Sequence, residues 1–220
     1  EMLRSLVGSE MCIRDRIDSY ISPATGKPIQ PNAAPGDTKF EDLNGDGVIS
    51  DDNEDRTMIG KPNPDWMVGL TVAADWNGFD LSAFFQGSFG ADVFDALRRY
   101  ELAAVNYTSD ALERWTGPGT SNSMPRIVLG DTPKNFRPST LLVHDASFLR
   151  LRNLQVGYTL PAQLTRKAYI QRLRFYASFD NLLTITGYKG MDPEIGSTMG
   201  IDKGVYPQAR VYTFGLNLTF

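Results

Sequence analysis

Residues 42–49 have the side chains and spacing of a calcium-binding loop. They read D-L-N-G-D-G-V-I, which places oxygen-bearing side chains at the first, third and fifth positions and a glycine at the sixth. In EF-hand loops these positions and the backbone carbonyl at the seventh bind Ca²⁺, which needs about six to eight oxygen ligands. The predicted ligands are Asp42, Asn44, Asp46, the carbonyl of Val48 and, at the twelfth position, Asn53.

The twelfth position of this loop departs from the expected pattern. An EF-hand has a bidentate acid there, whereas this chain has Asn53, so Glu54 or Asp55 would have to substitute. The alternative is an acidic surface turn without metal, because Asn-Gly and Asp-Gly favour turns by themselves. If calcium does bind, we expect a structural ion that rigidifies a loop rather than a catalytic ion.

Few other residues could do chemistry, and no enzyme is predicted. The chain has one histidine, His144, and one cysteine, Cys12, so a histidine-based zinc site, a Ser/His/Asp triad and an internal disulfide are not expected. Asp192 and Glu194 are the nearest approach to the paired carboxylates of a glycosidase. Nothing in the sequence fixes the distance between them.

Two aromatic residues in predicted loops, Trp115 and Tyr188, are candidates for substrate binding. Their rings could stack on a sugar. The alternative is that they pack within their loops.

The elements that position these residues are β-strands. Residues 212–220 alternate between large apolar side chains at even positions and small or polar side chains at odd positions. Burying the even set is worth about 1.5–3 kcal/mol for each large side chain, and a slip of one residue would replace that set with Asn217 and two threonines. The even register is therefore strongly favoured, and one side of this strand is wholly apolar.

The fold class predicted is all-β and antiparallel. Asn77-Gly78 is a strong hairpin signal between two alternating runs, and a change of phase near Asn153 predicts a β-bulge. The five predicted strands are 65–76, 79–90, 147–160, 172–185 and 209–220.

Short connections alternate with long ones, as in outer-membrane β-barrels. Within the long loops we expect short helices at 92–105 and 109–115. Because five strands cannot close a barrel, they are predicted to be the C-terminal part of a large transmembrane barrel with long extracellular loops. The side chains predicted to face the lumen are Asp80, Ser82, Gln86, Arg150, Arg152, Arg172, Arg174 and Asp180.

Composition limits the remaining possibilities. The net charge of −4 gives no basic surface for nucleic acid. Residues 1–16 lack the apolar region of a secretory signal and resemble translated adaptor sequence, so we expect an artefact that is unstructured or forms a short helix. Residues 17–220 are then one domain, the tail of a longer protein.

Several segments, in order, resemble the C-terminal part of SusC/RagA-type TonB-dependent outer-membrane transporters. They are 36–49, 56–64, 79–87 (F-D-L-S-A-F-F-Q-G), 114–117, 147–161 (S-F-L-R-L-R-N-L-Q-V-G-Y-T-L-P), 181–195 and 206–220. The resemblance implies a plugged barrel of roughly 22 strands that imports oligosaccharides, peptides or other nutrients through TonB. It also implies a SusD-like surface lipoprotein as partner.

The alternative function is a secreted β-sandwich that binds glycans with the help of calcium. The two interpretations differ in what covers the apolar side of the strands. A sandwich covers it with a second protein layer, whereas a barrel leaves it to lipid.

Overall fold

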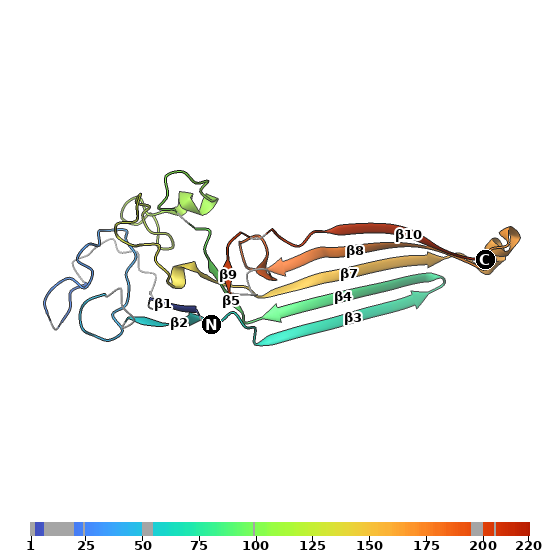
Figure 1. The fold of residues 1–220 in the computed structure, drawn as a ribbon, viewed down its shortest axis with the longest axis horizontal. Coiled ribbons are helices and arrows are strands. Elements are labelled where there is room, and N and C mark those ends of the chain that lie inside the picture. Colours follow the sequence, from blue (N-terminus) through green and yellow to red (C-terminus); the bar gives the residue numbers. More distant parts are fainter. Residues whose placement is uncertain are drawn as a thin grey trace. The chain divides into compact units, whose positions relative to one another are not determined.

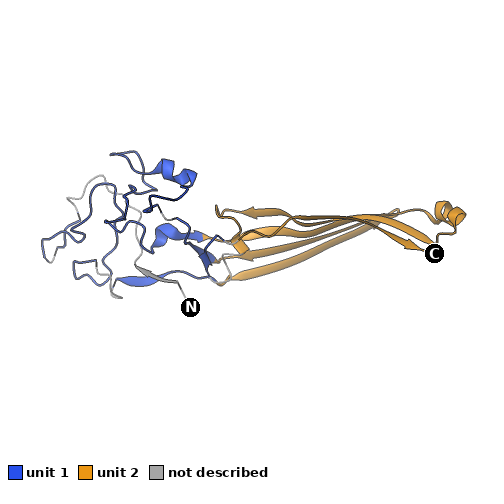
Figure 2. Cartoon of the chain, turned by 45° about the horizontal axis from the view of Figure 1, so that its top comes forward, with its two compact units in different colours: residues 1–62, 92–144, 196–204 blue, residues 63–91, 145–195, 205–220 orange. Residues whose placement is uncertain are grey.

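The structure is a computed structural model that describes residues 3–6, 20–23, 25–49, 55–98, 100–194, 200–204 and 206–220. The chain divides into two compact units (Figure 2). The loop unit comprises residues 1–62, 92–144 and 196–204, and the sheet unit comprises residues 63–91, 145–195 and 205–220. Among the described residues, no helix has the length and apolar character needed to cross a membrane.

The sheet unit contains one antiparallel sheet of five strands in the order β10-β8-β7-β4-β3 (Figure 1). Each predicted strand is present, with ends shifted by no more than a few residues. The strands are β3 (Trp66–Trp76), β4 (Phe79–Phe89), β7 (Phe148–Thr159), β8 (Arg172–Thr186) and β10 (Val211–Thr219).

Connections in this sheet follow the predicted alternation of short and long. Asn77 and Gly78 join β3 to β4, and both have the positive φ angles, 47° and 85°, that a tight hairpin turn requires. The β7–β8 connection holds only the short helices α1 (Ala162–Thr165) and η3 (Arg166–Ala168). By contrast, residues 90–147 separate β4 from β7, and residues 187–210 separate β8 from β10.

The register places apolar residues opposite one another across all five strands, so one face of the sheet is apolar, as predicted. Two successive rows are Val72–Ala83–Leu154–Phe179–Tyr212 and Ala74–Leu81–Val156–Ala177–Phe214.

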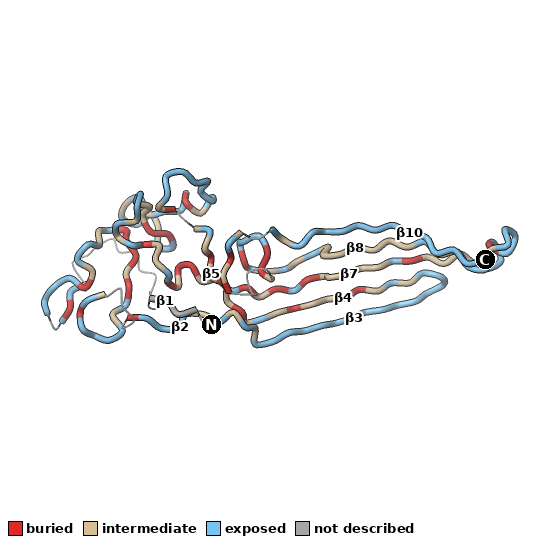
Figure 3. The backbone as a smooth tube through the Cα atoms, in the orientation of Figure 1, coloured by how far each residue is buried: buried red, intermediate tan, exposed pale blue. Residues whose placement is uncertain are grey.

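Nothing in the described chain covers this apolar face. Trp66, Trp76 and Phe214 are 73%, 77% and 74% exposed, and β3 and β10 are exposed along almost their whole length (Figure 3). A β-sandwich would bury such side chains against a second sheet. The described residues of this unit therefore lack the second layer that the sandwich alternative requires.

The loop unit has little regular structure. Its elements are β1 (Leu3–Leu6), β2 (Arg56–Gly60), β5 (Asp92–Asp95), η1 (Ser109–Glu113), η2 (Thr140–Leu142), β6 (Val143–Asp145, which ends in the sheet unit) and β9 (Ile201–Asp202). They form a β1-β2 pair and a small sheet of order β6-β5-β9. A compact apolar cluster of Tyr100, Ala111 and Met124, with Ile127 and Phe136 against it, supports the segment around η1.

Three local predictions for the loop unit need correction. The described residues of 92–105 contain no helix. Asp92–Asp95 is strand β5 instead, because Asp92 donates its N–H to Lys61 and Phe94 donates its N–H to Gly200. Leu3–Leu6 forms strand β1 in place of the expected unstructured segment or short helix. The helix expected at 109–115 is the 3₁₀ helix η1, which ends at Glu113.

Candidate functional site

The face of the sheet opposite the apolar one carries the charged side chains predicted for a lumen. Arg174 on β8 donates from Nε to Asp80 Oδ1 on β4 (2.8 Å) and pairs with the same carboxylate through Nη2. This ion pair passes over Gly157 on the intervening strand β7. An added Cβ at Gly157 would lie less than 3.0 Å from both Asp80 and Arg174, so a glycine is needed here to leave room for the pair.

We therefore expect Gly157→Ala to displace the Asp80–Arg174 pair. Overpacking of this kind costs about 1–3 kcal/mol, measured as a lower free energy of unfolding in detergent. Gly69→Ala is the matched control, because its Cβ would meet only the Phe84 ring at an ordinary 3.7 Å. Equal stability of the two variants would contradict the role of Gly157.

Nearer the long connections, two arginines of β7 bind two acids from the β8–β10 connection. Arg150 is 2% exposed and donates from Nη2 to Asp192 Oδ1 (2.7 Å), from Nη1 to Glu194 Oε2 (2.8 Å) and from Nε to Thr184 Oγ1 (2.9 Å). Arg152 donates to the other oxygen of Glu194. We call Arg150, Arg152, Asp192 and Glu194 the clamp.

The predicted β-bulge near Asn153 is confirmed. Both pairings of β7 slip between Leu151 and Asn153. Arg152 is an extra residue relative to β4, whereas in the β7–β8 pairing the extra residue lies on β8, between Asp180 and Leu183. The Arg152 guanidinium also donates to Gln86 Oε1 (2.7 Å) and Asn181 Oδ1 (3.3 Å). Arg150 and Arg152 share the polar face because they are two residues apart on the strand, and the bulge adds Asn153, which donates to Asp180 Oδ1 (2.7 Å), to the same face.

Asp192 is ionised in this setting. Burial raises the pKa of its carboxyl, but the hydrogen bonds from Arg150 and from the backbone N–H groups of Gln208 and Glu194 lower it, and the resulting pKa lies below the ordinary aspartate value. Both acids of the suggested glycosidase pair are thus engaged by arginines.

The lowered pKa of Asp192 predicts how the clamp responds to acid. The stabilisation that ionised Asp192 gives the folded state is present above the unfolded-state aspartate pKa of about 3.9. It is lost as the pH falls through the lower folded-state pKa. From pH 7 to about pH 5 the free energy of unfolding should keep this contribution, and below about pH 4 it should decline. Asp192→Asn should flatten that acid limb, and an unchanged acid limb would contradict the assignment.

The predicted calcium loop is closed by its own hydrogen bonds. Asp42 accepts the N–H groups of Gly45 and Gly47 (both 2.7 Å), and Asp46 accepts that of Val48 (2.8 Å). Asn44 Oδ1 accepts the N–H of Asp46 (2.9 Å). These contacts curl the loop tightly, and a turn without metal would make them as readily as a calcium-binding loop.

Of the candidates for the twelfth position of the calcium loop, the structure describes Asp55. Asn53 lies outside the described residues. Asp55, which is fully buried, accepts the N–H of Leu43 at 3.2 Å and so lies beside the loop. Among the described residues, no three histidine, cysteine or acidic side chains converge on a common point.

Trp115 and Tyr188 both lie against glycines. An added Cβ on Gly36 would overlap the indole of Trp115, and one on Gly190 would overlap the phenol of Tyr188. Trp115 is half-buried and Tyr188 is 7% exposed. Their packing role is therefore evident, while a contact with substrate stays a prediction.

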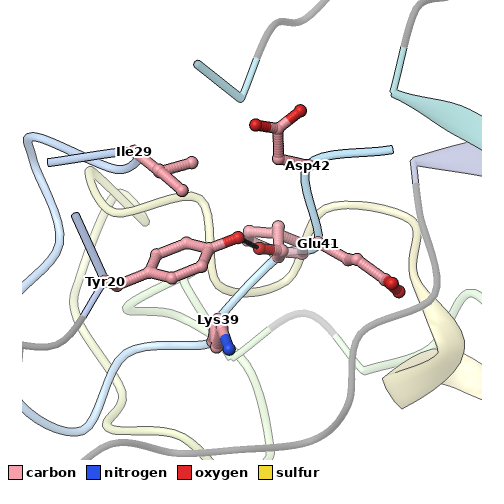
Figure 4. A pocket seen from close by; sticks show the side chains of 6 residues that line it. Tyr20, Ile29, Lys39, Glu41 and Asp42 are labelled. Atoms are coloured by element: carbon pink, nitrogen blue, oxygen red, sulfur yellow. Dashed lines mark hydrogen bonds between the residues drawn. The ribbon is translucent and has the colours of Figure 1, made fainter. Parts of the chain in front are cut away.

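One cavity in the loop unit was not anticipated from the sequence. It measures about 360 Å³ and is lined by Tyr20, Ile29, Lys39, Phe40, Glu41 and Asp42 (Figure 4). The Tyr20 hydroxyl donates to the carbonyl of Phe40, and the Lys39 ammonium lies 4.6 Å from the centre of the Tyr20 ring. The size of the cavity suits a small ligand. Its lining carries both a cation, Lys39, and two acids, Glu41 and Asp42, so its charge does not indicate one class of ligand.

The loop unit also contains a buried polar cluster that periodicity could not predict. Asp37 binds Arg126 through two hydrogen bonds, one of them Nη2 to Oδ2 at 2.9 Å, and accepts the side-chain N–H of Asn135 (2.9 Å). Asn135 is fully buried and also accepts the N–H of Thr38 (2.9 Å). These contacts join segments about ninety residues apart, so the cluster has a structural role.

Comparison with known proteins gives relatives of one kind. The chain is 36% identical over 203 residues to TonB-dependent receptor P3 of Formosa agariphila and 31% identical over 191 residues to TonB-dependent receptor SusC of Bacteroides thetaiotaomicron. The matches cover 87% and 86% of this chain but only 20% and 18% of the relatives. No protein-family model matches the chain.

A solved structure of the RagAB peptide transporter has a similar fold. It superposes with a TM-score of 0.68 at 31% identity, covering 84% of this chain and 21% of the matched chain. The chain thus spans about one fifth of the length of the proteins that it resembles.

Proposed function

Because this chain belongs to the SusC/RagA family of TonB-dependent outer-membrane receptors, we propose that it is part of the barrel wall of a nutrient importer. The apolar face of the five-stranded sheet would lie against lipid and the polar face would line the transport path. The observation that carries this proposal is the uncovered apolar face.

The dimensions of the sheet fit a bilayer. Strand β3 has 11 residues, which at about 3.3 Å per residue gives roughly 35 Å. A tilt of about 40° reduces this to roughly the 25 Å height of the apolar band of outer-membrane barrels. Trp66 and Trp76 stand at the two ends of β3, where such barrels carry interfacial aromatic residues.

For the whole protein we propose import of oligosaccharides or peptides, driven by TonB and assisted by a SusD-like surface lipoprotein. The support is the kinship with SusC and with the RagAB peptide transporter. The relatives are receptors and transporters rather than enzymes. TonB would act on parts of the receptor other than these strands.

Fractionation and uptake test this function. The full-length protein should be recovered from the outer membrane only with detergent, and cells should take up its oligosaccharide or peptide only when TonB is intact. A protein that stays in plain buffer, without membrane, would overturn the proposal. Uptake that persists without TonB would overturn its energy source.

We further propose that the loop at 42–49 binds one structural Ca²⁺ through Asp42, Asn44, Asp46 and the Val48 carbonyl, with Asp55 nearby in place of Asn53. The support is the closed loop geometry and the position of the buried Asp55. When bound, the ion would neutralise the loop carboxylates and stiffen the loop.

Calorimetric titration tests the calcium site. Adding Ca²⁺ to the full-length receptor should release heat that is absent when Asp42 and Asp46 are both changed to Ala. Glu41→Ala is the control, because Glu41 is an exposed acid next to the loop but not among its ligands. Equal heats from the wild type and the double variant would refute the site.

A further inference from the structure

The clamp joins both ends of the β8–β10 connection to the polar face of the sheet. At the first end, Asp192 and Glu194 bind Arg150 and Arg152 of β7. At the second end, the N–H of Gln208 donates to Asp192 Oδ2 at 3.1 Å. A chain segment far longer than a tight turn is thus held at two points.

Strand β8 contributes a further attachment through its irregular residue. Asn181 lies where the β7–β8 register slips, with a φ of 53°. Its side-chain oxygen accepts a hydrogen bond from Arg152 and its side-chain nitrogen donates to the carbonyl of Ala209 (3.0 Å). The same network therefore reaches from Gln86 on β4 to the residues just before β10.

The chemistry of the clamp favours a lasting attachment over a transient surface contact. Arg150 uses all three of its guanidinium nitrogens and is 2% exposed, and Asp192 is 4% exposed. Exposed ion pairs contribute little, whereas removing one partner of a buried pair strands the other charge. Opening the connection would expose two arginines and two acids together.

We propose that Arg150 and Arg152 are positioning residues that hold residues 187–194 and 206–210 against the polar face, so that these two segments form a fixed wall of the transport path and do not swing as a lid. The assignment of this face to a transport path rests on the proposed function. The attachment itself does not.

Proteolysis and spin labelling of the full-length receptor test the clamp. Lys189 and Met191 lie in the held segment, and both are exposed. Trypsin should cut slowly after Lys189 in the wild type, and a nitroxide on Met191→Cys, in an otherwise cysteine-free background, should be immobile. Arg150→Ala should raise the cutting rate about tenfold or more, because cleavage follows the population of the opened segment, and should free the label.

The matched control is Arg172→Ala. Arg172 is an exposed arginine on the polar face of β8 that makes no ion pair within 4 Å among the residues described. This variant should leave both readouts at wild-type values. If it loosens the segment as much as Arg150→Ala does, the clamp proposal fails.

A second variant keeps the test valid if Arg150→Ala does not fold. Asp192→Asn combined with Glu194→Gln removes the acids on the loop side and leaves the strands unchanged, and it should loosen the segment in the same way. Wild-type cutting and mobility in this variant would overturn the clamp. Because neither readout needs uptake, failure of the clamp and failure of the transport function are distinguishable.

Discussion

Replacing Leu70 with arginine should destabilise the full-length receptor by about 2–4 kcal/mol, the cost of an arginine on the lipid face near the bilayer midplane. Leu70 lies near the middle of β3, opposite Phe85 and on the apolar face. A guanidinium there would lose its water and gain no partner, because the rows around it are apolar. Unfolding by denaturant in lipid vesicles would measure the loss.

The adjacent Thr71 provides the control. It is at almost the same depth on the same strand but belongs to the polar face, opposite Phe84. Thr71→Arg should therefore cost at most a small fraction of the Leu70→Arg penalty. An equal loss of unfolding free energy in the two variants would show that both faces of the sheet have the same surroundings, which would contradict the barrel assignment.

Replacing Arg150 with methionine should cost about 3–5 kcal/mol of folding free energy, the usual result of removing one partner from a buried ion pair. Methionine keeps much of the side-chain volume, so the loss would come mainly from the charge of Asp192, which is left in a buried site. Chemical unfolding of the purified receptor would measure it.

A double variant separates charge from packing. If the stranded carboxylate causes the loss, Arg150→Met combined with Asp192→Asn should recover part of the stability, because a neutral amide is cheaper to bury than an ion. If the double variant is as unstable as the single one, the cause is packing, and the ionic account of the clamp is wrong.

The alternation of apolar and polar residues was sufficient to predict the sheet, because the surroundings of one sheet face are uniformly apolar. An apolar surrounding selects only for apolar side chains, so period two alone identified the strands and the phase slip near Asn153. The tight turn at Asn77-Gly78 was readable for a related reason, since its φ angles depend on two adjacent residues.

The loop unit could not be predicted in this way, because its contacts are specific and distant. Residues 92–95 have helical spacing, yet hydrogen bonds to Lys61 and Gly200 make them a strand. The alternation did place Arg150 on the polar face, but it could not name Asp192, which lies 42 positions along the chain, as its partner. In both cases, contacts between residues far apart in the sequence determined the structure.

The length of the β4–β7 connection has a consequence for the order of assembly. The β3–β4 hairpin closes around two residues, and β7 meets β8 through a short helical link, so each pair should form early and by itself. Joining β4 to β7 requires closure across residues 90–147, which is entropically costlier and slower. We therefore expect the β3–β4 and β7–β8 hairpins to form first, and the pairing of β4 with β7 to follow as a later step.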